Sequence, residues 1–96
     1  MSPPAVTLAA DDAETIRLVS AAFEEEGVPL SVVPPLPLRA AARTSPLGIA
    51  LARHDGRLAI GLSTGPDAPY LIGDDPRTMG RLAARLAAHR PLGALA

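Results

Sequence analysis

The chain contains no cysteine and no tryptophan, and it has only two aromatic side chains among its 96 residues. The missing cysteine excludes disulfides, thiolate chemistry and cysteine-ligated zinc sites together. Phe23 and Tyr70 are the only aromatics, and the 48% apolar fraction consists mostly of alanine, leucine and valine. A domain of this size with few large side chains builds a modest core. We therefore expect one small domain that gains stability by docking against another subunit.

Lysine is also missing, so nine arginines face ten acidic residues and the net charge is −1. No basic block or aromatic-interleaved stretch is present, which argues against a nucleic-acid partner. The first residues, Met-Ser-Pro-Pro, have neither the basic region nor the apolar run of a secretory signal, and no segment reaches membrane-spanning length. We expect a cytoplasmic protein without membrane contact.

Catalytic signatures are lacking as well. Neither the GxxxxGK[ST] nor the GxGxxG phosphate-binding pattern occurs, and Ser45 lies in no nucleophile elbow. His54 and His89 have no partner at catalytic or metal-ligand spacing. Asp11-Asp12 stands where phosphate-transfer receivers keep a metal-binding acidic pair, but a receiver also needs a lysine, and helix capping explains the pair better. The sequence thus predicts that the chain is not an enzyme.

The pattern along the chain indicates one α/β domain over residues 5–96, preceded by a flexible tail at 1–4. Asp11 and Glu14 have the spacing of a capping box, which predicts a helix from about residue 12. Asp55-Gly56 is the favoured pair for a tight type I′ hairpin turn. Because the hairpin is antiparallel, the sheet must be mixed. The expected strands are 5–10, 30–33, 48–53, 58–63 and 70–72, and the expected helices are 12–26, 38–43 and 77–89.

Three consecutive glutamates, Glu24-Glu25-Glu26, close the first predicted helix before Gly27 ends it. The end of a helix carries partial negative charge, so acids there are unfavourable by a few tenths of a kcal/mol each, roughly. One interpretation is simply a solvated helix end. The other is that the charges serve a cation or a basic partner, since local rules are broken where function requires it.

Helical periodicity separates the three glutamates. Ile16, Val19 and Phe23 form the predicted buried stripe, and Glu26 falls close to it, whereas Glu24 and Glu25 point outward. Glu25 shares its flank with three apolar residues: Leu18, Ala21 and Ala22. We expect this flank, with Glu24, to contact a partner, and we expect Glu25 to reach a cation or a metal ion such as Mg²⁺, which takes oxygen ligands.

The same residues resemble the small subunit of the glycerol/diol dehydratase reactivating factor. The likeness rests on Glu24-Glu25-Glu26-Gly27-Val28-Pro29, on the segment from Ala41 to Ala50, and on Ala83-Ala84-Arg85-Leu86 followed by Pro91-Leu92. These stretches occur in the same order and span roughly residues 5–92. None is a catalytic signature, and the likeness lies in their order and spacing.

The resemblance implies a Rossmann-like or flavodoxin-like domain similar to the medium subunit of the dehydratase. It also implies a large Hsp70-like ATPase partner, commonly in an α2β2 heterotetramer, which binds the ATP or ADP. Such factors act on adenosylcobalamin-dependent dehydratases: they release damaged cobalamin by a chaperone-like exchange of subunits. The middle glutamate of the family's motif, here Glu25, then ligates Mg²⁺ at the boundary with the ATPase subunit.

The chain departs from the family pattern near its end, where it has His89-Arg90 before Pro91 and Leu82 in place of an asparagine. These differences concern the fit of the last helix and leave open which substrate the dehydratase uses. Two alternatives remain: a medium, cobalamin-contacting subunit of the dehydratase itself, and a free-standing α/β interaction domain.

Overall fold

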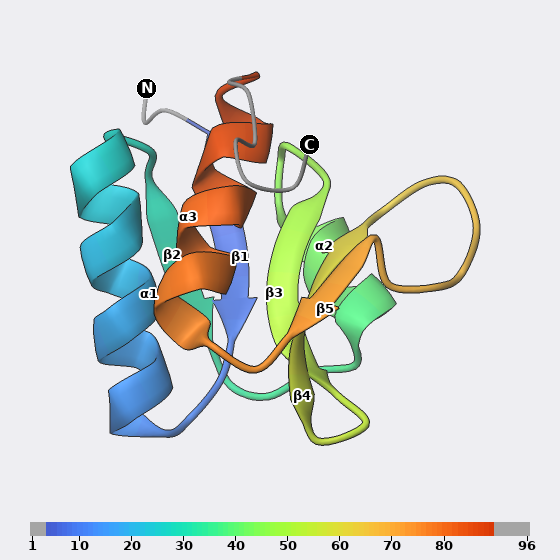
Figure 1. The fold of residues 1–96 in the computed structure, drawn as a ribbon. Coiled ribbons are helices and arrows are strands. Elements are labelled where there is room, and N and C mark those ends of the chain that lie inside the picture. Colours follow the sequence, from blue (N-terminus) through green and yellow to red (C-terminus); the bar gives the residue numbers. More distant parts are fainter. Residues whose placement is uncertain (1–3, 90–96) are drawn as a thin grey trace.

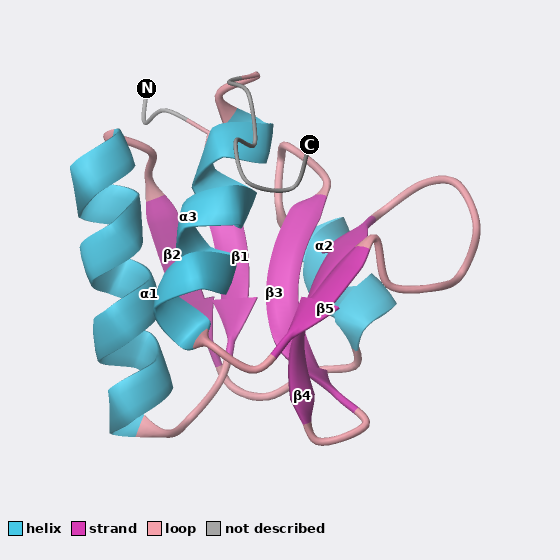
Figure 2. Cartoon of the chain, viewed as in Figure 1, coloured by secondary structure: helices cyan, strands magenta, loops and turns pink. Residues whose placement is uncertain are grey.

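The computed structural model describes residues 4–89 of the chain as a five-stranded sheet with three helices (Figures 1 and 2). The ends of the predicted tail and of the predicted domain, residues 1–3 and 90–96, lie outside the described residues. Within that range no helix is both long and apolar enough to cross a membrane. In chain order the elements are β1 (Val6–Ala9), α1 (Ala13–Glu26), β2 (Leu30–Val33), α2 (Leu38–Thr44), β3 (Ile49–His54), β4 (Arg57–Leu62), β5 (Leu71–Gly73) and α3 (Pro76–Ala87).

The strands lie in the order β2-β1-β3-β4-β5. β1 pairs in parallel with both β2 and β3, whereas β3–β4 and β4–β5 are antiparallel. Helices α1 and α3 cover one face of the sheet, and α2 covers the other (Figure 1). This confirms the predicted single α/β domain with a mixed sheet, a β-hairpin and flanking helices.

The hairpin between β3 and β4 forms where the sequence predicts it. Asp55 and Gly56 have φ angles of 51° and 76°, so both central turn residues adopt the left-handed conformation that a type I′ turn requires. The register is unbroken from His54↔Arg57 to Ile49↔Leu62. The predicted strands 48–53 and 58–63 are therefore each within one residue of the observed β3 and β4.

The start of α1 corrects one prediction. Asp12, not Asp11, is the N-cap: its backbone is extended and its Oδ2 accepts a hydrogen bond from the Thr15 amide at 3.0 Å. The predicted capping box is wrong, because Glu14 instead forms an ion pair with Arg17 at 2.8 Å. Either aspartate can serve as a cap chemically, so the sequence placed this helix end one residue too early.

Helix α3 begins at Pro76, one residue before the expected start at residue 77. Asp75 caps the helix through the Thr78 amide, and Pro76 occupies the first turn, where its missing N–H costs nothing. Hydrogen bonding from the Thr78 side chain lowers the pKa of Asp75. The helix ends at Ala87, so it is slightly shorter than expected.

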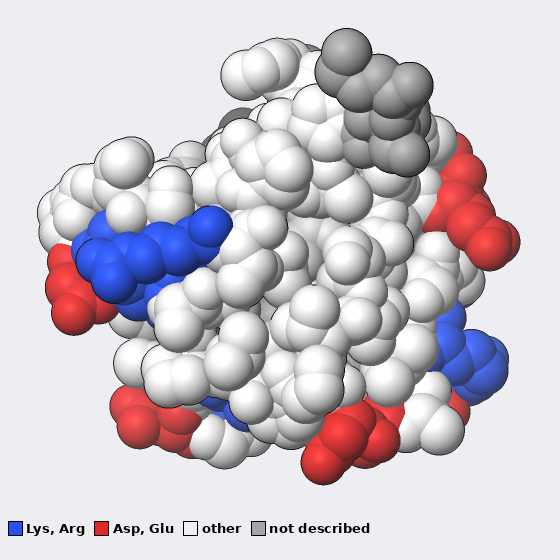
Figure 3. All heavy atoms as spheres, turned by 180° about the vertical axis from the view of Figure 1, so that it is seen from behind, with Lys and Arg blue, Asp and Glu red and all other residues white. Residues whose placement is uncertain are grey.

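The two faces of the sheet are packed differently. The face under α1 and α3 carries the large buried side chains, among them Val6, Leu8, Leu51, Leu58 and Ile60. The face under α2 is lined by small ones, namely Ala9, Ala50, Ala52 and Ala59 against Ala41 and Ala42. Seen from behind, this second side is largely uncharged at its centre, with acidic and arginine side chains along the margins (Figure 3).

Candidate functional site: the α1 terminus and its contacts with α3

The C-terminal turn of α1 holds the three glutamates in a fixed order. Gly27 adopts φ +71°, and its amide bonds the Glu24 carbonyl at 3.2 Å. The next amide, of Val28, bonds the Phe23 carbonyl at 3.1 Å. This pair of reversed hydrogen bonds is the Schellman arrangement, which glycine favours because positive φ costs it nothing. The helix end is thus rigidly closed, and only the side chains of the glutamates differ in what they reach.

Each glutamate has a different environment. Glu24 is exposed and has no ion pair within residues 4–89. Glu25 has 58% of its side chain exposed and forms an ion pair with Arg77, whose Nη2 donates to Oε1. Glu26 has only 14% of its side chain exposed, and its Oε1 accepts from Arg85 Nε at 3.3 Å. Periodicity correctly separated Glu26 from the two outward residues.

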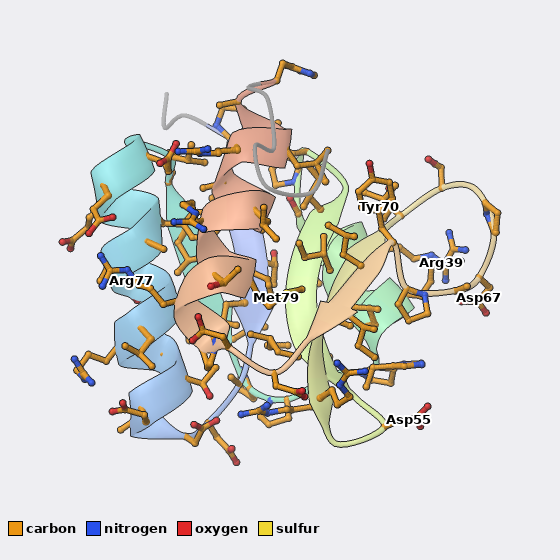
Figure 4. The ribbon with its side chains drawn as sticks, in the orientation of Figure 1. Arg39, Asp55, Asp67, Tyr70, Arg77 and Met79 are labelled. Atoms are coloured by element: carbon orange, nitrogen blue, oxygen red, sulfur yellow. The ribbon has the colours of Figure 1, made fainter. Side chains whose placement is uncertain are left out.

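The partners of Glu25 and Glu26 come from α3, which lies beside α1 (Figure 4). Arg77 is in the first turn of α3, where a cation opposes the helix dipole just as an acid does at the end of α1. Each member of the Arg77–Glu25 pair is therefore poorly placed in its own helix and compensated by the other. Periodicity did not reveal Arg77 and Arg85, because they lie 52 and 59 residues away along the chain. The sequence did offer one signal: Arg77 lies in the first turn of a helix, where a cation is unfavourable, which indicates an acidic partner elsewhere in the chain.

Close packing of the two helices makes these contacts possible. A Cβ built on Gly80 of α3 would lie 3.1 Å from the Ala22 Cβ and 3.1 Å from the Val19 Cα. Ala22 is completely buried by this contact. The expectation that Ala22 lies on an outward flank is therefore wrong: the small side chain serves the helix–helix interface within the chain. Leu18 and Ala21 remain partly exposed, so a narrower strip is left beside Glu25.

The carboxylate of Glu25 suits a metal ion only as one ligand of a shared site. Its Oε1 bonds Arg77, and Oε2 has no hydrogen bond to any residue in the described part of the chain. Mg²⁺ commonly takes one or two protein carboxylates and completes its shell with water or other ligands. No group of three or more acidic or histidine side chains capable of holding an ion occurs among residues 4–89. A divalent ion at Glu25 would need further ligands from water or from a second chain.

A second polar cluster lies at the carboxyl ends of β1 and β3. Arg53 Nη2 donates to Thr15 Oγ1 at 2.8 Å and lies 3.8 Å from Asp12 Oδ1. Hydrogen bonds from the side chain and amide of Thr15 lower the pKa of Asp12, and Arg53 adds a smaller effect in the same direction. An open depression of about 320 Å³ adjoins them, and its lining combines alanines, prolines and a leucine with two aspartates and Arg53. Open α/β sheets often bind ligands at this position, but here Asp12 caps α1 and Arg53 ties β3 to that cap.

The other residues weighed in the sequence have structural roles where they are described. The buried Ser45 hydroxyl donates to the Ala5 carbonyl at 2.7 Å and accepts from the Leu47 amide at 3.1 Å, so it fastens the loop before β3 to the start of β1. His54 is half-buried and lies 3.6 Å from Asp55. His89 is exposed, and Arg90, the other variant position, lies outside the described residues.

Similarity to solved structures shows which family the chain belongs to. No family model matches the chain, and neither does any curated protein. Two solved structures do. A glycerol dehydratase reactivase superposes with a TM-score of 0.80 and 30% identity, covering 95% of this chain and 97% of the matched one. A diol dehydratase-reactivating factor complexed with ADP and Mg²⁺ gives 0.71 and 32%, covering 95% and 98%. The chain therefore belongs to the family of glycerol and diol dehydratase reactivating factors.

Proposed function

We propose that the chain is the small, non-catalytic subunit of an ATP-dependent factor that restores inactivated adenosylcobalamin-dependent dehydratase. The observation that carries this proposal is the end-to-end match to chains of reactivating factors, which leaves at most 3% of either matched chain uncovered. The matched chains are thus about as short as this one. A large ATPase subunit would be several times longer.

The sequence contains no phosphate-binding motif, which favours a partner as the site of ATP hydrolysis. In the proposed cycle this subunit leaves an Hsp70-like ATPase subunit, which then binds the medium subunit of the dehydratase in its place. The complex with dehydratase loosens and releases the damaged cobalamin. An α2β2 assembly fits a small domain with a modest core, since docking supplies the burial that the domain lacks.

Within this function Glu25 would hold Mg²⁺ at the boundary with the ATPase subunit, beside the strip formed by Leu18 and Ala21. The exposed carboxylate supports this role, as does the Mg²⁺ with which the related diol dehydratase-reactivating factor is complexed. A magnesium ion bound there would join oxygen ligands of the two subunits by electrostatic attraction. Glu24 would lie at the rim of the same contact.

The decisive experiment is co-purification of the tagged chain from its native cells, followed by identification of the large band. We expect an ATPase that hydrolyses ATP in the complex, whereas the chain alone does not. Robust hydrolysis by the isolated chain would contradict the proposal. Recovery of a cobalamin-binding dehydratase with this chain as a permanent component would identify a medium subunit instead, and isolation without any large partner would favour a free-standing domain.

The metal assignment needs its own test. Glu25→Gln should weaken association of the two subunits in magnesium and leave the isolated fold intact, because the glutamine keeps the size of the side chain and removes its charge. Glu24→Gln is the matched control and should do much less. Equal effects of the two substitutions would indicate diffuse charge attraction without coordination.

A further inference from the structure

We propose that Arg77 is an internal competitor for Glu25 and sets the magnesium concentration at which the subunits associate. This inference rests on the proposed function, because it concerns the same carboxylate. In the isolated chain Arg77 occupies one oxygen of Glu25. Association through a metal ion then requires that the arginine give up, or share, the carboxylate.

The exposure of the pair makes this exchange feasible. The side chains of Arg77 and Glu25 are 45% and 58% exposed, so water and salt screen their attraction. The neighbouring pair of Arg85 and Glu26 is 34% and 14% exposed. The Arg85–Glu26 pair, the inner pair, is therefore suited to holding the helices together. The Arg77–Glu25 pair, the outer pair, is the one that opens at low cost.

Opening the outer pair need not disturb the fold. The backbone at Glu25 is fixed by the closed turn at Gly27, and the helices are held at Gly80 by contact with Ala22 and Val19. These contacts do not depend on Arg77. The competition is therefore a change of side-chain partners on a rigid frame, and loss of Arg77 should alter ion affinity without unfolding the domain.

The expected size of the effect follows from charge. If a divalent ion bound the same carboxylate, the Arg77 guanidinium would be roughly 5 Å from it, and the repulsion between their charges in water would lower the affinity about tenfold. Removal of the positive charge should thus lower the magnesium requirement about tenfold. Arg77→Lys retains the charge and should stay near the wild-type requirement.

The test is a magnesium titration of the complex formed with the co-purified large subunit, read as the fraction of small subunit that elutes with it. Arg77→Gln should reach half-maximal association at about tenfold less magnesium than wild type. Arg81→Gln is the matched control: Arg81 lies one turn further along α3, is exposed, and has no ion pair within residues 4–89. It should shift the midpoint much less.

An Arg77→Gln midpoint at higher magnesium would overturn the inference, because it would mean that Arg77 orients Glu25 for the metal. An unchanged midpoint would overturn it too, and so would unfolding of Arg77→Gln in a thermal melt. Failure of the proposed function is distinguishable from these results. In that case the Glu25→Gln variant would associate with the same magnesium dependence as the wild type, or no large partner would co-purify at all.

Discussion

Gly80 is the residue on which the contact between α1 and α3 most depends, and Gly80→Ala tests that dependence. In an exposed helix this substitution stabilises by about 1 kcal/mol, because alanine is the better helix former. Here the new Cβ would lie 3.1 Å from the Ala22 Cβ, 3.1 Å from the Val19 Cα and 3.3 Å from the Val19 carbonyl oxygen. Two of these three atoms are backbone, so relief requires movement of a whole helix.

Overpacking of this kind costs about 1–3 kcal/mol. Set against the gain in helix propensity, the net change is a destabilisation of about 1 kcal/mol, which corresponds to a fall in Tm of about 4–8 °C for a domain of this size. Thermal unfolding followed by circular dichroism measures it, with Arg81→Ala on the exposed side of the same helix as the control. A rise in Tm for Gly80→Ala would refute the close packing. In an Ala22→Gly background the cost of Gly80→Ala should shrink, because one of the clashing atoms is gone.

Local geometry supports three more predictions. Hydrogen bonds from Thr15 lower the pKa of Asp12 in the folded state below its ordinary value of 3.8. The charged cap therefore stabilises the fold above pH 3.8, and this stabilisation is lost as the pH falls further. Asp12→Asn keeps a hydrogen-bond acceptor but cannot ionise, so it should flatten the fall in Tm between about pH 4 and about pH 2. Glu26→Gln should lower the free energy of unfolding in chemical denaturation by about 1–2 kcal/mol, because it weakens a largely buried bond to Arg85. A loss no larger than that of an exposed substitution would contradict a stabilising role of the Arg85–Glu26 pair. Gly56→Ala should cost about 1 kcal/mol through backbone strain alone at φ +76°, since no atom lies within 4 Å of the new Cβ, and an unchanged Tm would rule out the type I′ turn.

Signals that act over a few residues were sufficient for most of the fold. The turn at Asp55-Gly56, the stop at Gly27 and the proline at the start of α3 each fix a boundary through the backbone of their own neighbours. The error at the start of α1 has the same origin. Two adjacent aspartates offered equivalent caps, and the residues around them in the sequence do not distinguish one from the other.

The site could be predicted only in part, because its contacts join distant segments. Periodicity identified Glu25 as outward and Glu26 as nearly buried, which the exposed fractions confirm. It could not reveal that Arg77 and Arg85 would arrive from α3, nor that Ala22 would be buried by Gly80. A small apolar residue on a helix flank is compatible with a surface strip and with a close helix contact alike, and only tertiary structure separates the two.

The glutamate run also shows why a broken local rule does not by itself identify an external partner. Three acids at a helix end are unfavourable, and two of them form ion pairs within the chain, with Arg77 and Arg85. An ion pair within the chain reduces the need for a cation from outside, but the two ion pairs differ in how far they do so. The pair of Glu26 is largely withdrawn from solvent, whereas that of Glu25 stays open to exchange, and Glu24 has no ion pair among residues 4–89. The proposed metal site at Glu25 therefore rests on the exposure of that carboxylate and not on the number of charges beside it.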